Sequence, residues 1–456
     1  MAMGPFRVTI RGKTYDAMAD LIRKYRLSLA GHTGKTARGG YVVDALVDSD
    51  QIERLRAAGY RVDVCEDARE EGKKRQAEIR SLAVRAAATH VTGADHYLTV
   101  DDVERLLANA AAAPNTAFTQ LIPLPNKTWE GRKCHAIRIG HGNQPNRPGI
   151  YLLGGVHARE WGSCDILINF VEQLCDAYRN QSAITIGGAT FTAAQIQAIV
   201  NGKDIYVFPQ ANPDGRNHSM TADPMWRKNR RPPASASNNP DCTGVDINRN
   251  YDFLWDYPTH FSPHAPVQNS TDPCDPQVYI GPAAVSEPET KNAVWMFDTN
   301  PGIGYFIDVH SYAEDILYSW GDDDDQSKSQ QMNFRNAAFD GKRGVHGDTG
   351  YKEFIPSTDK AAAQNLAKAM SAAIQSVRGR KYTVMQSMSL YPTAGCSDDY
   401  AYSRHFADAS KAKVLSYTVE WGSGKNSTPF HPPYPEMKQI IQEITAALLR
   451  FCVDAA

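Results

Sequence analysis

The spacing of hydrophobic positions predicts a small domain at the start of the chain. Residues 7–11 alternate apolar and polar side chains as a half-buried strand does, and residues 15–25 repeat apolar side chains at helical spacing. Residues 41–47 and 60–64 are typical of further strands, and the helix predicted between them ends at Gly59. We therefore predict a small βαβαβ unit of the α+β class over residues 1–65.

A different pattern follows. Residues 66–94 are rich in Arg, Glu, Lys and Ala, which predicts a solvated, charged connecting helix or linker. Beyond it strands alternate with helices, and the apolar run at residues 150–154 is typical of a strand buried on both faces. Further strands are expected at residues 134–139, 205–208, 306–309 and 414–419, with helices at 160–178 and 360–377. The pattern predicts one large α/β domain over residues 95–456, with a mixed sheet and helices on both of its faces.

Composition narrows the class of protein. Apolar and charged fractions of 42% and 22% are ordinary for a globular protein, and a formal charge of −2 argues against nucleic acid or an anionic membrane as a partner. No apolar run approaches the length of a membrane span. Residues 1–7 lack the apolar core of a signal peptide. We favour a secreted protein whose signal is absent from this sequence, and a cytoplasmic protein is the alternative.

Candidate chemistry lies at the ends of two predicted strands. Residues 155–161 hold His157 and Glu160, and residues 306–312 hold His310. Two imidazole nitrogens and one carboxylate suit Zn²⁺, and three protein ligands leave a fourth position for water, as in catalytic zinc sites. Hydrogen-bonded histidines of an ordinary core are the alternative interpretation.

The first of these segments resembles the zinc-ligand motif of the metallocarboxypeptidases, the carboxypeptidase A/B family. The remaining motifs of that family have counterparts here in the same order, and the resemblance covers roughly residues 95–452. The matching segments are Met225-Trp226-Arg227-Lys228, Asp246-Ile247-Asn248-Arg249-Asn250, Phe306 to Tyr312, Leu390 to Tyr400, and Tyr417 to Gly422.

The resemblance implies a role for each metal-site residue. His157, Glu160 and His310 would hold one Zn²⁺ per chain. Asp246 resembles the aspartate that orients a ligand imidazole and raises its basicity. A turn-forming aspartate is the alternative for this residue.

Two further residues would carry out the hydrolysis. Glu420 ends an apolar strand, where a carboxylate is costly to bury, and it resembles the family's general base. Arg227 resembles the arginine that stabilises the oxyanion of the transition state. Taken alone, a surface arginine in the basic run of residues 227–231 is the simpler interpretation.

A carboxypeptidase must also recognise a free C-terminal carboxylate. A guanidinium binds a carboxylate through two parallel hydrogen bonds, so Arg249 fits this role, aided by Asn248 and the hydroxyl of Tyr391. Arg159 and Tyr312 resemble residues that contact the next substrate position.

Asp398 aligns with the position at which relatives that release C-terminal Lys or Arg carry an acid. A carboxylate at the base of a closed pocket would pair with a substrate cation. A shift of one residue in the alignment would place Asp399 there instead. Cys396 stands where a smaller residue is expected and would narrow the pocket.

The N-terminal unit resembles the family's pro-segment, an open-sandwich domain that shields the active site until proteolysis. Its position ahead of the large domain agrees with a zymogen. Arg80 and Arg85 in the connector are candidate cleavage points, although exposed arginines are usually only solubilising.

Two other features are open to more than one interpretation. Cys242 and Cys274 flank residues 248–249 in a stretch rich in Pro and Asp, where we expect a disulfide; eight free thiols are the alternative. Asp322 to Asp325 predict a solvated acidic loop, with a Ca²⁺ site as the second interpretation.

We therefore expect a monomeric, zinc-dependent exopeptidase that acts on the C-termini of peptides or proteins. It should prefer C-terminal Arg or Lys, with some tolerance of apolar residues. The alternatives are a carboxypeptidase of apolar specificity, a zinc amidase acting on acyl amino acids, and a non-catalytic peptide-binding relative.

Overall fold

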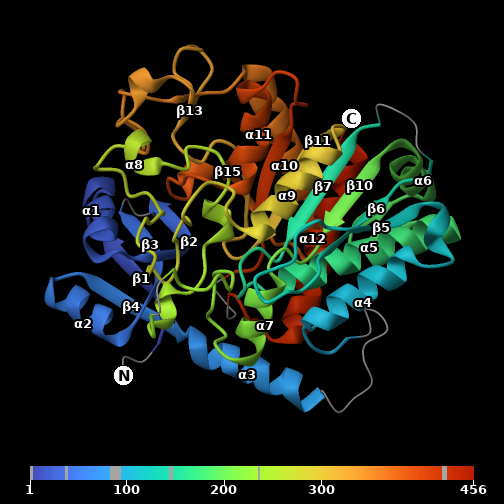
Figure 1. The fold of residues 1–456 in the computed structure, drawn as a ribbon, viewed down its shortest axis with the longest axis horizontal. Coiled ribbons are helices and arrows are strands. Elements are labelled where there is room, and N and C mark those ends of the chain that lie inside the picture. Colours follow the sequence, from blue (N-terminus) through green and yellow to red (C-terminus); the bar gives the residue numbers. More distant parts are fainter. Residues whose placement is uncertain are drawn as a thin grey trace.

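Two sheets organise the chain in the computed structural model, which describes residues 4–35, 40–82, 94–142, 147–234, 237–423 and 429–455. The first sheet belongs to the N-terminal domain, drawn in blue in Figure 1, and the second belongs to the large domain beside it. No helix among the described residues is long and apolar enough to cross a membrane.

The N-terminal domain has a four-stranded antiparallel sheet in the order β2-β3-β1-β4. Its elements are β1 Phe6–Gly12, α1 Tyr15–Tyr25, β2 Ser28–Lys35, β3 Tyr41–Val47, α2 Ser49–Ala57 and β4 Arg61–Asp67. The α+β class is as predicted, but β2 is an additional strand. Its sequence, SLAGHTGK, has two glycines and few apolar residues, so it gives no alternation that a pattern search would detect.

The two faces of this small sheet have different partners. Val8 and Ile10 of β1 point to the domain's own core, which α1 and α2 cover. On the other face, Ala30 of β2 and Leu46 of β3 join Met225 of the large domain in a second apolar cluster. The sheet is therefore packed between its own helices and the large domain.

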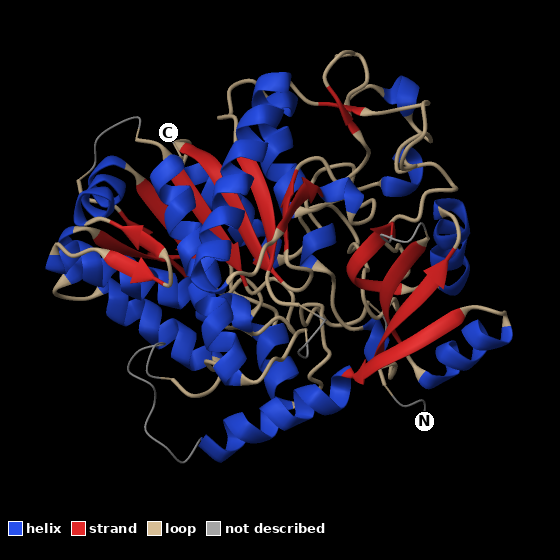
Figure 2. Cartoon of the chain, turned by 180° about the vertical axis from the view of Figure 1, so that it is seen from behind, coloured by secondary structure: helices blue, strands red, loops and turns tan. Residues whose placement is uncertain are grey.

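The connector is less solvated than its composition predicts. Helix α3, Ala68–Leu82, runs along the large domain (Figures 1 and 2). Its Gln76 is buried and donates a hydrogen bond from Nε2 to the carbonyl of Ser219 at 2.7 Å. Arg69 pairs with Asp223 at 2.6 Å. One side of this charged helix is thus anchored to the large domain.

The large domain is built on an eight-stranded mixed sheet in the order β15-β12-β16-β11-β7-β10-β6-β5. The central strands β10, β7, β11 and β16 are mutually parallel, and antiparallel pairs join β6 and β12 to them. The strands are β5 Thr119–Pro123, β6 His135–Ile139, β7 Gly149–Gly154, β10 Asp204–Phe208, β11 Ile303–His310, β12 Asp315–Tyr318, β15 Thr383–Gln386 and β16 Leu415–Glu420. Two small ribbons are β8 Ile184–Ile186 with β9 Ala189–Phe191, and β13 Asp325–Gln326 with β14 Glu353–Phe354.

Helices cover both faces of this sheet, as predicted (Figure 2). One core cluster packs α4 Val100–Ala111, α5 Gly162–Asn180, α6 Ala193–Gly202, α10 Ser357–Arg378 and α12 Tyr434–Asp454. The cluster on the opposite face packs α9 Pro288–Thr299 and α11 Ser397–Ala407. The remaining helical segments are α7 Pro213–Thr221, α8 Tyr257–His260, and short 3-10 turns at Asn115–Ala117, Pro240–Cys242, Ile247–Arg249, Ala337–Phe339 and Ser387–Ser389.

Candidate metal centre and active site

The carboxyl ends of two neighbouring parallel strands bring the predicted metal residues together. His157 and Glu160 lie in the turn between β7 and α5, and His310 is the last residue of β11. The turn after β7 begins at Gly155, which has φ +65°, and a Cβ there would lie 2.8 Å from the sulfur of Cys164. Glycine is therefore required at the point where the chain leaves the sheet for the site.

The three candidate ligands point at one another. Nδ1 of His157 lies 2.8 Å from Oε1 of Glu160, and Nδ1 of His310 lies 3.1 Å from Oε2 of the same carboxylate. The two Nδ1 atoms are 3.0 Å apart, and all three side chains are buried. In the described part of the chain this is the one group of three such residues able to hold a metal ion. The donor set fits Zn²⁺.

The outer nitrogens of both imidazoles face carboxylates. Nε2 of His157 lies 3.2 Å from Oδ1 of Asp246, and Nε2 of His310 lies 2.8 Å from Oδ2 of Asp308. Such partners fix the ring orientation and leave Nδ1 free for a metal. Asp308 was not predicted, although its position two residues before His310 on one strand puts both side chains on the same face.

Positively charged neighbours lower the pKa values of the carboxylates around the metal centre. Burial alone would raise the pKa of Asp246, but Arg227 and His157 hold it well below its usual range. Arg227 donates from Nε and Nη2 to Oδ2 of Asp246, at 3.1 and 2.9 Å. Burial also opposes ionisation of Glu160, and His157 outweighs it, so that this pKa is lowered too.

Strand register places Glu420 beside the metal residues. Strand β16 pairs in parallel with β11 so that Glu420 is opposite His310. Its Oε2 atom is buried and has no hydrogen-bond partner among the described residues. Burial raises the pKa of this carboxyl group to about 8. A carboxyl group held in this way can take up and release a proton near neutral pH.

The expected carboxylate-binding residues line the same cavity. Arg249 is buried and donates at 2.6 Å to the carbonyls of Gln268 and Asn248. The side-chain oxygen of Asn248 accepts a hydrogen bond from the backbone N–H of Ser397 at 2.8 Å. Tyr391 also lines the cavity and packs against the core of the N-terminal domain.

Asp398 lines the cavity, and its neighbour Asp399 points elsewhere. Oδ2 of Asp398 accepts hydrogen bonds from the hydroxyls of Ser387 at 3.1 Å and Thr418 at 3.2 Å. No basic side chain forms an ion pair with Asp398 in the residues that the structure describes, and burial raises its pKa. Asp399 instead accepts a hydrogen bond from the backbone of Gly321 at 2.8 Å.

Some residues of this pocket were not found from the sequence. Leu317, Ser387 and Thr418 line the cavity. Leu317 and Ser387 belong to no segment chosen for its chemistry, and Thr418 lies in the segment Tyr417 to Gly422 but was given no role of its own. Leu317 and Thr418 lie opposite each other on the neighbouring strands β12 and β16. Only the strand order, which the sequence pattern does not reveal, shows that they meet here.

Arg159 and Tyr312 also lie in the cavity, and both are buried. Nη1 of Arg159 donates to Oε1 of Gln277 at 2.7 Å, and its guanidinium lies 4.6 Å from the centre of the Phe430 ring. Burial and the neighbouring Arg227 lower the pKa of Arg159 to about 10. Tyr312 donates from its hydroxyl to the carbonyl of Ala30, in the N-terminal domain, at 3.2 Å.

The N-terminal domain closes this site. The cavity measures only about 60 Å³, and Leu29 and Ala30 of β2 form part of its wall. A pocket for a small ligand is usually on the order of several hundred Å³. The strand that the sequence pattern missed is thus the one that covers the catalytic residues.

The two remaining predictions have different outcomes. The disulfide between Cys242 and Cys274 is present, whereas Cys65, Cys134, Cys164, Cys175, Cys396 and Cys452 are free. The Ca²⁺ interpretation of Asp322 to Asp325 gains no support, and neither does the solvated loop, because Asp322 and Asp323 are fully buried. Asp323 accepts a hydrogen bond from the backbone of Gly344, and Asp325 pairs with Lys360.

Solved structures share this architecture. The crystal structure of carboxypeptidase A from Helicoverpa armigera matches 99% of the chain and 98% of its own, with a TM-score of 0.74 and 20% identity. That of thrombin activatable fibrinolysis inhibitor matches 98% of both chains, with a TM-score of 0.68 and 18% identity. At these identities the similarity defines the fold, which is that of a carboxypeptidase with its leading domain.

Sequence comparison then defines the family. The zinc carboxypeptidase family model matches residues 105–448, so the chain belongs to the zinc carboxypeptidase family. Human carboxypeptidase B is 30% identical over 60% of this chain and 53% of its own length. Carboxypeptidase B of Helicoverpa zea is 26% identical over 94% of the chain and 87% of its own. The chain spans about half the length of the first curated relatives that it matches.

Proposed function

We propose that the protein is a zinc-dependent carboxypeptidase that removes C-terminal residues, with a preference for Arg and Lys. One observation carries this proposal. His157, Glu160, Glu420 and Arg249 line one cavity, and His310 completes the zinc-type donor set against the first two. One oxygen of Glu420 has no partner among the described residues, and Arg249 is buried. Membership of the zinc carboxypeptidase family supports it.

The residues around the metal centre divide the work of hydrolysis. Bound zinc supplies Lewis acidity and a water of lowered pKa. Glu420 takes the proton of the attacking water on its unpaired oxygen and passes it to the departing amine. Arg227, held by Asp246, presents its guanidinium to the oxyanion that develops on the scissile carbonyl.

Arg249 and Asp398 select the substrate. The guanidinium of Arg249, with Asn248 and Tyr391, binds the terminal carboxylate and so requires a free C-terminus. Among the described residues Asp398 has hydroxyl partners but no cation, so a substrate ammonium or guanidinium would complete its surroundings. Relatives named carboxypeptidase B support the proposed preference, and relatives named carboxypeptidase A support the alternative of apolar specificity.

The N-terminal domain acts as an inhibitory pro-segment in this proposal. Leu29 and Ala30 line the cavity where the substrate would lie, and the hydroxyl of Tyr312 donates a hydrogen bond to the carbonyl of Ala30. Cleavage in the connector would release the domain. Arg80 is exposed on α3 and remains a candidate cleavage point, whereas Arg85 lies outside the described residues. Secretion, a monomeric state, and peptide or protein C-termini as partners complete the proposal.

The test is an assay of matched peptides that end in Arg, Lys, Phe or Leu, before and after limited trypsin treatment and with and without a chelator. We expect chelator-sensitive release of the last residue, fastest for Arg and Lys, and a rise in activity when the connector is cut. Faster release of Phe or Leu would support apolar specificity. Hydrolysis of acyl amino acids alone would indicate an amidase, and no hydrolysis at all would indicate a binding protein. Full activity before cleavage would contradict the inhibitory role.

A further inference from the structure

A second, larger cavity separates the two domains. It measures about 1060 Å³ and is formed on one side by α1, α2 and the strands near them, and on the other by loops of the large domain. It begins next to the closed active site, because Ser28 lines this cavity and the following residues, Leu29 and Ala30, line the catalytic one.

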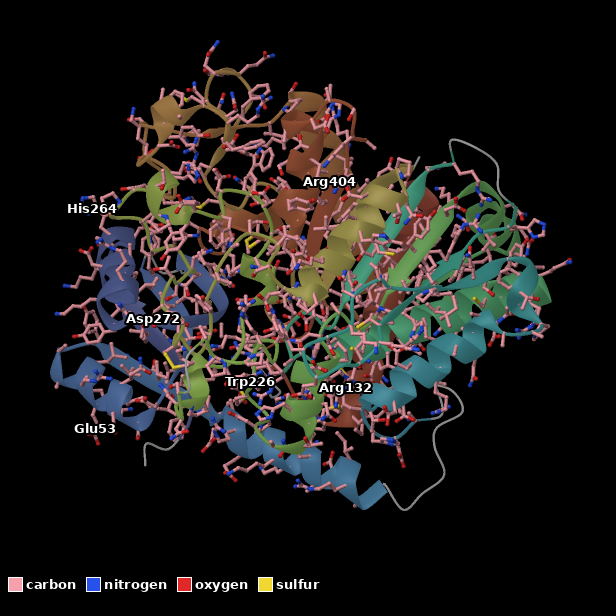
Figure 3. All side chains as sticks on the ribbon, in the orientation of Figure 1. Glu53, Arg132, Trp226, His264, Asp272 and Arg404 are labelled. Carbon is pink, nitrogen blue, oxygen red and sulfur yellow. A yellow bond between two sulfur atoms is a disulfide. The ribbon has the colours of Figure 1, made fainter. Side chains whose placement is uncertain are left out.

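The two walls of this cavity carry opposite charge. The wall from the N-terminal domain and α3 has five basic side chains and the acid Asp48; the basic ones are Arg23, Lys24, Arg26, Arg54 and Arg69. The facing wall has four acids and, among the described residues, no basic one. These four form what we call the acidic wall: Asp223, Asp241, Asp272 and Asp275. Asp272 and Trp226, both of which line this cavity, are labelled in Figure 3.

Basic side chains of the N-terminal part already occupy the acidic wall. Nη1 of Arg69 lies 2.6 Å from Oδ1 of Asp223, and Nη1 of Arg26 lies 4.0 Å from Oδ2 of Asp272. Both pairs are partly exposed to solvent, where such a contact contributes little stability by itself. The acidic wall therefore attracts basic side chains and is not held tightly by Arg26 or Arg69.

A disulfide and several hydrogen bonds hold the loops of the acidic wall in place. The disulfide between Cys242 and Cys274 joins the segment that carries Asp241 to the segment that carries Asp272 and Asp275. Oδ1 of Asp275 accepts hydrogen bonds at 2.8 Å from the backbone of the two residues at 277 and 278. The buried Lys228 beneath the wall donates to the backbone carbonyls of Asp241 and Asp275, so it supports the loops and leaves the carboxylates exposed.

The acidic wall continues into the catalytic site. Gln277, two residues after Asp275, accepts the hydrogen bond from Arg159 of the cleft. Met225, two residues after Asp223, packs in the apolar cluster with Tyr312. A peptide whose terminal carboxylate lies on Arg249 would pass these residues and then reach the wall with the residues before the scissile bond.

We propose that the acidic wall docks basic residues upstream of the scissile bond of a peptide substrate, and that the N-terminal domain holds this wall with basic side chains of its own. The inference rests on the proposed carboxypeptidase function and deepens it. The enzyme would act best on C-termini that are rich in Lys and Arg over several residues. Release of the N-terminal domain would become easier as salt screens the two walls from each other.

The regulatory half can be tested on the uncleaved chain. Arg26→Ala with Arg69→Ala should raise peptidase activity several-fold at low salt, because the N-terminal domain is held less firmly. Arg61→Ala, an exposed arginine of the same domain away from the cavity, is the matched control and should leave activity unchanged. Exchanging the two charges of one pair, Arg69→Asp with Asp223→Arg, keeps the attraction between the domains. This variant should therefore have the same low activity as the native uncleaved chain. Equal activity in all four proteins would overturn the proposal.

The substrate half uses the full chain cut with trypsin, after the trypsin has been inhibited. Two peptides share their last three residues and differ upstream, one with Lys-Lys-Lys and one with Gln-Gln-Gln. We expect kcat/KM to be about tenfold higher for the lysine peptide at low salt and nearly equal at high salt. Asp272→Asn with Asp275→Asn should remove the difference and leave the glutamine peptide unaffected. A preference that persists in this variant, or none in the native protein, would overturn the proposal. Chelator-sensitive cleavage of the glutamine peptide tests the carboxypeptidase function separately.

Discussion

Carboxylates on the two sides of the catalytic cavity have opposite surroundings. On the metal side, Glu160 and Asp246 face imidazoles and a guanidinium, and their pKa values are lowered in spite of burial. On the pocket side, burial raises the pKa of Asp398, whose partners among the described residues are hydroxyl and backbone groups. Buried carboxyl groups therefore have lowered pKa values where positive partners face them, and a raised pKa where only hydroxyl and backbone partners do.

The difference shows what each side lacks. The metal side has its positive partners in the chain, and its three converging donors call for one more cation among them. The pocket side has no cation in the described residues, so a bound proton or a basic substrate must supply the missing charge. Four substitutions can break or sharpen this comparison.

The largest effect should come from the metal side. His310→Gln removes one of three donors, so zinc content should fall well below one per chain and peptidase activity should fall to background. Elemental analysis and peptide hydrolysis measure the two quantities. His264→Gln, at an exposed histidine labelled in Figure 3, is the control and should keep both. Normal activity without metal in the His310 variant would refute the zinc site.

Glu420→Gln should reduce turnover by about a thousandfold or more while zinc and substrate still bind, because it removes the base and leaves the donors in place. Glu53→Gln, on the exposed face of α2, is the control. Single-turnover kinetics together with zinc analysis separate chemistry from binding. If turnover is nearly normal, Glu420 is not the base.

On the pocket side, Asp398→Ala should lower kcat/KM for Arg-ended peptides on the order of a hundredfold, because the substrate cation loses its partner. Peptides ending in Phe or Leu should be cleaved equally well or better, since a buried carboxylate has been removed. An equal loss on both kinds of substrate would mean that Asp398 acts on structure and not on specificity.

The smallest effect concerns stability and pH. Burial raises the pKa of Asp323, in the segment that follows β12, from 3.8 to about 9. The folded chain thus binds this proton more tightly than the unfolded chain, so the free energy of unfolding should fall as pH rises through this interval. Asp323→Asn should make the chain more stable at about pH 8 by on the order of 1 kcal/mol and flatten the pH dependence. Urea unfolding at several pH values measures both, and an unchanged slope would contradict the assignment.

The sequence predicted the elements that carry dense apolar patterns and missed those that depend on pairing. The buried runs of β7, β11 and β16 were recognised, and so were His157 after β7, His310 at the end of β11 and Glu420 at the end of β16. The strand β2 was not, because its two glycines break the alternation. Residue types also could not show that His310 lies opposite Glu420, since this contact follows from strand order and register.

The helix starts illustrate the same limit on a smaller scale. In the sequence, Asp50 with Glu53 three residues later predicts the N-terminal cap of α2, and Asp101 predicts that of α4. In the structure Asp48 and Thr99 take these places, each in a reciprocal pair of hydrogen bonds with the residue three positions later. Several Asp and Thr residues near a helix start can all serve as caps, and only the backbone geometry of the folded chain selects among them.

The order of the two sheets along the chain has a consequence for synthesis on the ribosome. All strand pairs of the N-terminal sheet lie between residues 6 and 67, so this sheet can form before most of the large domain has emerged. The catalytic site needs His157, then His310, and finally Glu420 from β16. During synthesis the covering domain can therefore form long before the catalytic site is complete, because a nascent chain that ends before residue 420 lacks the proposed base.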